Sequence, residues 1–208
     1  MAQTQNNVVL DGYFGNDLDC ARAAWTSTNR DVTEDKKARV GKLLTMLASD
    51  HHLTPFEHTY LRFLVDCETA SHVHLLKHRI GVSINGESAR YKELKADKYH
   101  IPRDWHAEEQ QALLAHCEES FAKYHACLAR LQAGGMDRKR AKESARFYLP
   151  YANSLTLCVS MNLRSFFHFQ FLRNSEHAQL EIREIAQRML QLVKDSGAFP
   201  LTIEAFGY

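Results

Sequence analysis

The chain has 208 residues, enough for one domain with a substantial core, and its formal net charge is +1. Apolar residues make up 45% and charged residues 25% of the sequence, which is the balance of a globular protein. With a net charge this close to zero, the chain lacks the basic excess that is typical of nucleic-acid-binding proteins. It contains no run of about 18 apolar residues, so no membrane-spanning helix is predicted.

The N-terminus and the cysteines indicate the compartment. Residues 1–15 lack the basic start and the long apolar core of a signal peptide, so we expect a cytoplasmic protein. From the net charge and the lack of a long apolar run, we expect no nucleic-acid partner and no membrane partner. The five cysteines are odd in number, widely spaced and free of any C-x-x-C motif. They predict reduced, mostly buried thiols and neither a disulfide framework nor a structural zinc site.

The first third of the chain predicts one strand and two helices. Residues Val8–Phe14 are typical of a short strand, and Asp19–Trp25 of a brief helix. Thr33 is a suitable N-cap for a second helix, which Pro55 prevents from continuing. The apolar face of that helix is expected to contain Val40, Leu43, Leu44 and Leu47.

A strand and a helix are expected next. His58–Asp66 is rich in β-formers, and its alternating residues Thr59, Leu61, Phe63 and Val65 would share one face. Glu68–Arg79 predicts a helix, and Leu94–Tyr99 a weak strand or a loop.

A long helix is predicted after Asp104, which is a suitable N-cap, and Gly134 and Gly135 would end it. Its apolar stripe is formed by Leu113, Leu114, Cys117, Phe121, Tyr124, Leu128 and Leu131.

The last third is mainly helical. Asp137 would start a helix that ends before Pro150, whereas Ser154–Asn162 is compatible with either a strand or a helix. Leu163–Arg173 and Ala178–Lys194 predict two more helices. Because strands and helices do not alternate, the pattern favours an α+β fold, formed by a single domain over residues 1–208.

One segment, Lys77–Tyr91 with the sequence KHRIGVSINGESARY, concentrates hydrogen-bonding groups. The Asn85-Gly86 pair is a strong hairpin-turn signal, so the polar residues around it could simply be solvated. The alternative is a site for a small phosphorylated ligand. Lys77, Arg79 and Arg90 would supply the charge, and turn amides further donors.

Other cations stand among apolar helix residues. Arg146 precedes FYLP, and Arg164 and Arg173 lie nine positions apart in an apolar helix. Nine positions are about 2.5 helical turns, so these two arginines would face different ways. A surface salt bridge could account for any one of them, but accounts less well for Arg173.

Histidines suggest a rival metal site. His74 and His78 are four residues apart, which would put both on one helix face, and His51, His52 or His58 could complete a ligand set. The chain has no H-E-x-x-H motif, so this signal is weak.

Four separated blocks resemble the flavin-dependent thymidylate synthases. LTPFEH (Leu53–His58) is similar to the family's S-P-F-E-H stretch, and Lys77–Tyr91 to its signature R-H-R, seven residues, then S-x-R-Y. ARFYLP (Ala145–Pro150) is similar to A-R-x-x-L-P. Asn162–Glu184 is similar to N-x-R, L-R and A-Q-x-E-I-R. Their order and spacing match over roughly residues 8 to 195.

The resemblance implies a fold, ligands and a reaction. The fold would be α+β, with a small antiparallel sheet flanked by helices, assembled as a homotetramer with sites at the subunit interfaces. Each site would bind FAD and dUMP. Methylenetetrahydrofolate would supply the carbon that methylates C5 of dUMP, NADPH would reduce the flavin, and no cysteine would act as nucleophile.

The resemblance also implies residue roles. The nucleotide would be bound by His74, Arg79, Glu87, Ser88, Ala89, Arg90, Arg146 and Arg173. The flavin would be bound by Ser27, Glu57, Lys77, His78, Arg79, Asn85, Asn162, Arg164, His168, Gln179 and Ile182. The catalytic group would comprise Arg173 and Ser88. Arg173 would stabilise charge on a uracil carbonyl, while Ser88 would contact the nucleotide without acting as nucleophile, because no base is evident beside it.

Several departures from the family pattern affect the nucleotide segment. Lys77 replaces the first signature Arg, His74 replaces a Gln, and Glu87 is displaced relative to the family's N-E-x-S. Eight residues separate Arg79 from Ser88, so the loop is expected to bulge or reroute. These departures keep two alternatives open: hydroxymethylation of dUMP or dCMP, and a non-catalytic flavin or nucleotide binder.

Overall fold

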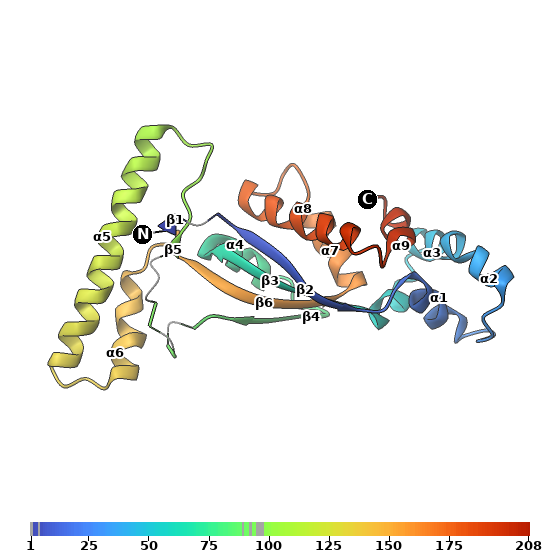
Figure 1. Cartoon of the computed structure of the whole chain (residues 1–208), viewed down its shortest axis with the longest axis horizontal. Coiled ribbons are helices and arrows are strands. Elements are labelled where there is room, and N and C mark those ends of the chain that lie inside the picture. The colour runs from blue at the N-terminus through green and yellow to red at the C-terminus, as the bar shows by residue number, and fades with distance from the viewer. Residues whose placement is uncertain (1, 4, 89, 92, 95–97) are drawn as a thin grey trace. The chain divides into compact units, whose positions relative to one another are not determined.

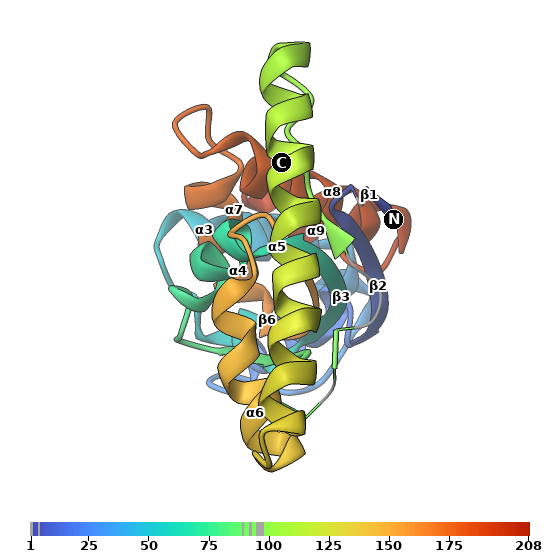
Figure 2. The same ribbon diagram turned by 90° about the vertical axis from the view of Figure 1, so that its left-hand side faces the viewer.

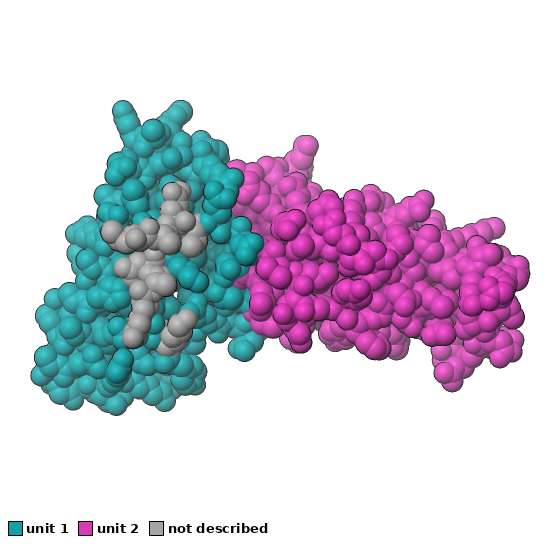
Figure 3. Space-filling view, in the orientation of Figure 1, with its two compact units in different colours: residues 1–7, 66–75, 85–157 teal, residues 8–65, 76–84, 158–208 magenta. Residues whose placement is uncertain are grey.

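We analysed a computed structural model of the chain, which describes residues 2, 3, 5–88, 90, 91, 93, 94 and 98–208. The chain divides into two compact units, each assembled from three segments (Figure 3). Unit 1 comprises residues 1–7, 66–75 and 85–157, and unit 2 comprises residues 8–65, 76–84 and 158–208. The expectation of one domain over residues 1–208 therefore stays a prediction.

A four-stranded antiparallel sheet has the strand order β2-β3-β6-β4 (Figure 1). Its strands are β2 (Asn7–Phe14), β3 (Tyr60–Glu68), β4 (Val82–Gly86) and β6 (Ser154–Asn162). The alternation predicted for β3 is confirmed, because Leu61, Phe63 and Val65 are buried and the residues between them are exposed. The sheet and its helices confirm the α+β prediction, and the segment left open between strand and helix is β6.

In unit 2, helix α7 (Leu163–Arg173) packs on the sheet and beside α8 (Leu180–Asp195). Phe63 of β3 and Phe166 of α7 stack with ring centroids 6.1 Å apart. Gln170 is fully buried, and its side-chain amide donates to the Ala186 carbonyl at 2.9 Å. The predicted helix bounds are confirmed for α7, and α8 begins two residues later than predicted.

The remaining helices of unit 2 pack on one another. They are α1 (Asp17–Trp25), α2 (Glu34–Ala38), α3 (Val40–Ser49), the short 3-10 helix η1 (Thr54–His58) and α9 (Pro200–Ala205). Helix α3 packs against α9, and α1 packs against both η1 and α3. Thr33 caps α2 as predicted, because its hydroxyl accepts from the Lys36 N–H. The prediction of a single helix after Thr33 is wrong, because the backbone leaves helical geometry at Arg39 and two helices, α2 and α3, form instead.

Asp17 joins the two ends of unit 2. This carboxylate is 7% exposed and accepts hydrogen bonds from the backbone N–H groups of Leu201 and Thr202, both at 2.9 Å, and from the Thr202 hydroxyl. It therefore acts as the missing side-chain cap for α9, a helix that the sequence analysis did not predict.

We expect Asp17→Ala to destabilise the protein by about 2–3 kcal/mol, because a charged acceptor is lost and buried N–H groups lose their partner. Urea unfolding followed by circular dichroism measures this. Asp19→Ala is the matched control, since Asp19 forms a partly exposed ion pair with Arg22 in the first turn of α1, and its loss should cost below about 1 kcal/mol. Equal effects of the two substitutions would contradict the capping role.

Unit 1 contains the long helix α5 (Ala107–Ala133), with α6 (Arg138–Ala145) beside it in both views (Figure 1 and Figure 2). Its other elements are β1 (Ala2–Gln3), α4 (Thr69–Leu76), β5 (Lys98–Tyr99) and the 3-10 helix η2 (Arg146–Tyr148). Strand β5 lies within the predicted weak strand, of which residues 95–97 fall outside the described residues. Tyr124 and Leu128 from the predicted stripe pack against Ala141 and Ala145 of α6.

The ends of α5 test the predicted caps. Gly134 is the C-cap and Gly135 has a positive φ of 86°, as expected, and Asp137 caps α6. The N-cap of α5 is His106, so the prediction of Asp104 is wrong, and no side chain caps this end. No described helix is long and apolar enough to cross a membrane.

Two predictions around the polar segment are also wrong. Helix α4 ends at Leu76, so His78 lies beyond it and does not share a helix face with His74. The Asn85-Gly86 pair forms no hairpin turn but ends strand β4. Pairing with β6 overrides the local turn preference, because the Glu87 N–H continues the ladder to the Thr156 carbonyl at 2.8 Å.

Candidate active site

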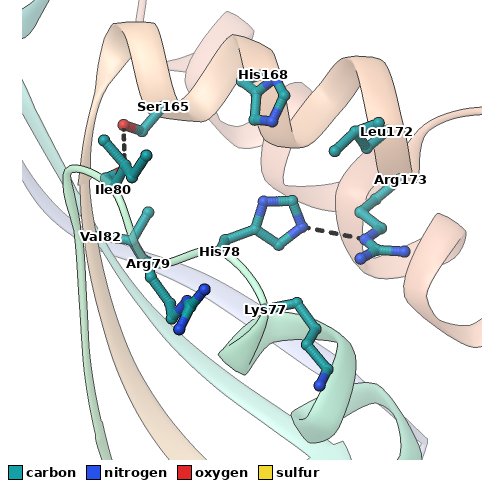
Figure 4. Close-up of a pocket in the computed structure, with 9 residues that line it drawn as sticks. All are labelled: Lys77, His78, Arg79, Ile80, Val82, Ser165, His168, Leu172 and Arg173. Atoms are coloured by element: carbon teal, nitrogen blue, oxygen red, sulfur yellow. Dashed lines mark hydrogen bonds between the residues drawn. The ribbon is translucent and has the colours of Figure 1, made fainter.

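A cavity of about 230 Å³ in unit 2, the cationic pocket, lies between the chain that follows α4 and helix α7 (Figure 4). Lys77, His78 and Arg79 line it from one side, and His168 and Arg173 from the other. Its described lining contains no carboxylate. This charge suits an anionic or electron-rich ligand.

Arg173 is held inside the cationic pocket by His78. The Arg173 Nε–H donates to Nε2 of His78 at 3.1 Å, so this imidazole nitrogen carries no proton in the bonded state (Figure 4). The rings of His78 and Phe169 meet in a T-shaped contact, with centroids 5.0 Å apart. The bond fixes the plane of the guanidinium, whose Nη groups remain as donors.

Helix α7 also anchors the chain that forms the other wall. The Ser165 hydroxyl donates to the Ile80 carbonyl at 2.7 Å, and the Asn162 N–H donates to the Gly81 carbonyl at 3.3 Å. Gly81 has a φ of +65°, and a Cβ there would lie 2.4 Å from the Ser165 hydroxyl oxygen. Only glycine therefore fits this approach to the start of α7.

A second cavity of unit 2, the aromatic pocket, has a volume of about 510 Å³. It is lined by Phe167, Phe171, Phe206 and Tyr208, with His51 and Arg164. Ile80, Ser165 and His168 line both cavities, so the two pockets adjoin. Arg164 and Arg173 thus line different pockets, as their spacing on a helix predicted.

Arg164 forms a half-exposed ion pair with Glu57 of η1. This pair brings two of the predicted flavin-binding residues together. Asn162 has a structural task as well: its side chain caps α7 by accepting from the Ser165 N–H at 2.8 Å.

Three further predicted flavin contacts lie outside the described lining of both pockets. The Ser27 hydroxyl is exposed and donates to the Ala24 carbonyl at 2.9 Å. The Gln179 amide donates to Glu181 at 2.7 Å. Ile182 is fully buried, so it presents no surface to a ligand.

The other predicted nucleotide residues lie in unit 1. Glu87 and Ser88 follow β4, and the Ser88 hydroxyl accepts from the Arg90 N–H at 3.2 Å. The Arg90 guanidinium pairs with Glu143 of α6, and this hydrogen bond lowers the pKa of the Glu143 carboxyl. Arg146 is exposed in η2.

Three more residues were predicted to bind a ligand: His74 and Ala89 the nucleotide, and Asn85 the flavin. His74 is half-buried on α4, Asn85 is exposed in β4, and Ala89 lies outside the described residues. His74, Asn85 and Arg90 belong to unit 1, whereas Arg79 and Arg173 belong to unit 2.

The expected bulge in the nucleotide segment is not found between Gly81 and Glu87. The Asn162 N–H donates to the Gly81 carbonyl, and the Glu87 N–H donates to the Thr156 carbonyl. From Gly81 to Glu87 the chain advances by as many residues as it does from Thr156 to Asn162 on the facing strand β6, so neither strand contains an extra residue between these two bonds. The Glu87 carboxylate also accepts from the Thr156 N–H at 3.4 Å. Any rerouting by the extra residue therefore lies outside this stretch.

Sequence reasoning missed the aromatic pocket and the shared residues Ile80 and Ser165. The four-residue spacing of Phe167 and Phe171 could have signalled a helical aromatic stripe, but the contribution of Phe206 had no local signal. Among the described residues, no group of three or more His, Cys, Asp or Glu side chains could hold a metal ion.

The chain matches the family model described as thymidylate synthase complementing protein over residues 9–200. A flavin-dependent thymidylate synthase of Pseudothermotoga lettingae is 32% identical over 206 residues, which cover 96% of this chain and 89% of that protein. One from Thermosipho africanus is 30% identical over 207 residues, covering 93% and 87%.

Solved structures extend the comparison. The UMP/dUMP methylase PolB from Streptomyces cacaoi, bound with 5-Br dUMP, is 26% identical with a TM-score of 0.79 and covers 98% of this chain and 95% of its own. The same methylase bound with 5-Br UMP has a TM-score of 0.80 at 26% identity, covering 98% and 94%.

Proposed function

The chain belongs to the thymidylate synthase complementing protein family, and from this membership we propose that it is a flavin-dependent thymidylate synthase that methylates C5 of dUMP. The observation that carries the assignment is the Arg173–His78 pair inside a pocket that also contains Lys77 and Arg79. Fixed donors of this kind stabilise a ring oxygen that gains negative charge.

Arg173 is the group that we assign to the reacting ring. Attack on a uracil ring moves negative charge onto a carbonyl oxygen, and the Nη donors of Arg173 can bind that oxygen. His78 positions the guanidinium through the Nε–Nε2 bond. Because the donors are already oriented, little reorganisation is needed when the charge develops.

The residues present fit a flavin of the FAD type. Lys77 and Arg79 offer N–H donors for ring carbonyl oxygens and phosphates, and the apolar side chains of Ile80 and Leu172 in the same lining suit contact with a flat ring. Reduced flavin supplies the hydride. We further assign NADPH as the reductant and methylenetetrahydrofolate as the carbon donor, as co-substrates.

The loop of unit 1 is assigned to the phosphate and ribose of the nucleotide. Arg90 and Ser88 supply donors within one turn, and exposed Arg146 can add a second cation. Arg90 is already paired with Glu143. The phosphate therefore has to displace the Glu143 carboxylate from the Arg90 guanidinium or share the guanidinium with it.

We propose a homotetramer working in the cytoplasm. The predicted site residues are scattered over both units, and a site completed by neighbouring subunits is consistent with that. Light scattering of the flavin-bound protein should give the mass of four chains. A catalytically competent monomer would contradict this part.

No cysteine should be required for turnover. Burial raises the pKa of Cys20 to about 12 and that of Cys117 to about 11, and it also raises the pKa of Cys67. Such thiols remain protonated at neutral pH and are poor nucleophiles.

A variant with all five cysteines replaced by Ala or Ser should therefore keep its kcat within about threefold, while each replacement at a buried position should cost about 0.5–3 kcal/mol of stability. Steady-state kinetics at a temperature where the variant is folded measure this. Single replacements serve as controls. If one of them abolished turnover in a folded, flavin-bound protein, the assigned mechanism would be wrong.

UMP is a second candidate substrate. The solved structures with the same fold are titled as a UMP/dUMP methylase, and one of them holds 5-Br UMP. The departures at Lys77, His74 and the Arg79–Ser88 spacing lie in the nucleotide segment. Parallel assays with UMP and dUMP at equal concentration decide between them.

The flavin assignment has its own test. The visible spectrum of the pure protein should show flavin bands, which disappear when the flavin is removed by denaturation and filtration. A colourless protein that does not take up added FAD would contradict it.

A further inference from the structure

Helix α6 holds the chain that follows β4 by two side-chain contacts within unit 1. The Lys142 ammonium group donates to the Tyr91 carbonyl at 2.8 Å, and the Arg138 guanidinium donates to the Glu93 carboxylate at 3.2 Å. The same chain contains Arg90, which the proposed function assigns to the nucleotide phosphate. Helix α6 therefore fixes the neighbourhood of that cation.

Leu94 anchors the same chain further along. Its side chain is buried in an apolar cluster with Tyr124 of α5 and Ala141 of α6. The Leu94 N–H also donates to the Tyr124 hydroxyl at 3.3 Å. Burial of an apolar side chain is a stronger anchor than an exposed polar contact, so the chain is attached to both helices.

Glu143 of α6 binds the guanidinium of Arg90. The Arg90 Nε–H donates to the Glu143 carboxylate, and the guanidinium carbon lies 5.4 Å from the centre of the Tyr91 ring. Arg140 approaches the same carboxylate only to 3.7 Å, so Arg90 is its nearer partner. The hydrogen bond from Arg90 lowers the pKa of the Glu143 carboxyl, which is therefore ionised at neutral pH.

A carboxylate and a phosphate use the same donors of an arginine. Either anion binds to the N–H groups of the planar guanidinium. Glu143 thus occupies the cation that the proposed function assigns to the phosphate.

Two explanations of the Arg90–Glu143 pair make opposite predictions. An ordinary surface ion pair contributes little, since the Arg90 side chain is 46% exposed, and its removal would leave nucleotide binding unchanged or weaken it. An anion that competes with the phosphate would, when its charge is removed, leave Arg90 free and strengthen nucleotide binding.

The reaction gives such competition a use. Methylation at C5 leaves the 5′-phosphate unchanged, so a phosphate contact holds the substrate and the product equally. Too strong a contact would retain the product on the protein. An anion that competes for Arg90 limits this affinity and favours product release.

We propose that Glu143 is a positioning residue that holds Arg90 in place of the phosphate and gives it up when the nucleotide binds. The proposal rests on the proposed function, which assigns Arg90 to the nucleotide phosphate. Glu143 then sets the affinity for the phosphate through Arg90, without contact with the reacting ring.

The test measures the binding of dUMP, inorganic phosphate and 2′-deoxyuridine to the flavin-bound protein by calorimetry. Glu143→Gln keeps the length of the side chain and an acceptor oxygen but removes the charge. It should tighten the binding of dUMP and of inorganic phosphate about 2- to 5-fold, the range of an exposed ion pair. The affinity for deoxyuridine, which has no phosphate, should stay unchanged. Removal of a merely structural contact would not strengthen the binding of an anion.

Two comparisons assign the effect to Arg90. In the Arg90→Ala background, Glu143→Gln should no longer tighten the binding of either anion. Glu93→Gln is the matched control, because Glu93 pairs with Arg138 in the same chain, and it should leave both affinities unchanged. Unchanged or weaker anion binding in Glu143→Gln would overturn the proposal, and so would equal tightening in the Arg90→Ala background or in Glu93→Gln.

The outcome is separable from that of the proposed function. If no methylated nucleotide forms but Glu143→Gln still tightens the binding of inorganic phosphate through Arg90, the competition stands and the reaction assignment fails. If methylation occurs and Glu143→Gln changes neither anion affinity, the competition alone is wrong.

Discussion

Arg173→Ala is expected to lower kcat on the order of 10²–10³-fold while the protein stays folded and retains flavin. The reason is that Arg173 is assigned to an oxygen whose charge changes during the reaction, so its loss is felt in the transition state. Its bond to His78 shows that the guanidinium is oriented before any ligand arrives. Steady-state kinetics with flavin occupancy measured from the visible spectrum give the result.

Arg173→Lys is the informative companion. Lysine keeps the charge but lacks the planar fork, so it can satisfy either His78 or the ring oxygen, and we expect little rescue. His78→Gln should lower kcat less than Arg173→Ala does, because the guanidinium stays but loses its orientation. If Arg173→Ala left kcat unchanged in a flavin-bound protein, the assignment of Arg173 to the reacting ring would be refuted.

Arg90→Ala is expected to act on binding. Arg90 is assigned to a phosphate that does not change during the reaction, so its loss weakens the ground state and the transition state alike. The apparent KM for the nucleotide should rise about 10- to 100-fold, which corresponds to one lost charge-assisted contact. The kcat at saturating nucleotide should stay within about threefold.

Arg140→Ala is the matched control for Arg90→Ala. Arg140 also approaches Glu143, at 3.7 Å, and sits on the same helix α6, but it is not assigned to the nucleotide. Its removal should leave KM unchanged. A fall in kcat with unchanged KM in Arg90→Ala would contradict the phosphate role.

Local signals explain what could be predicted of the fold. The alternation in β3, the apolar run of α7 and the Asp137 cap are each encoded within a few neighbouring residues. Helix α9 was missed because it has only six residues and its cap, Asp17, is 185 positions away. Such a helix depends on tertiary hydrogen bonds that no local window contains.

For the site, too, features with local sequence signals could be predicted and tertiary contacts could not. The motif that begins at Lys77 drew attention to His78 and Arg79, and the block Asn162–Glu184 to Arg173, and these three residues line the cationic pocket. The Asn85-Gly86 signal was misleading because pairing with β6 decides the conformation there. The aromatic pocket could not be predicted, since His51, Phe171 and Tyr208 come from three distant segments.

The most direct test of the central claim is the mass of the product. The purified protein is incubated with dUMP, methylenetetrahydrofolate, NADPH and FAD, and the nucleotide is weighed by mass spectrometry. We predict a product in which a methyl group replaces the hydrogen at C5, so that dUMP gains the mass of one CH2. The new methyl carbon should carry the label when the folate carbon is isotopically labelled, and no product should form when NADPH is omitted. Unchanged dUMP in the presence of bound flavin, or a product carrying a hydroxymethyl group, would contradict the account.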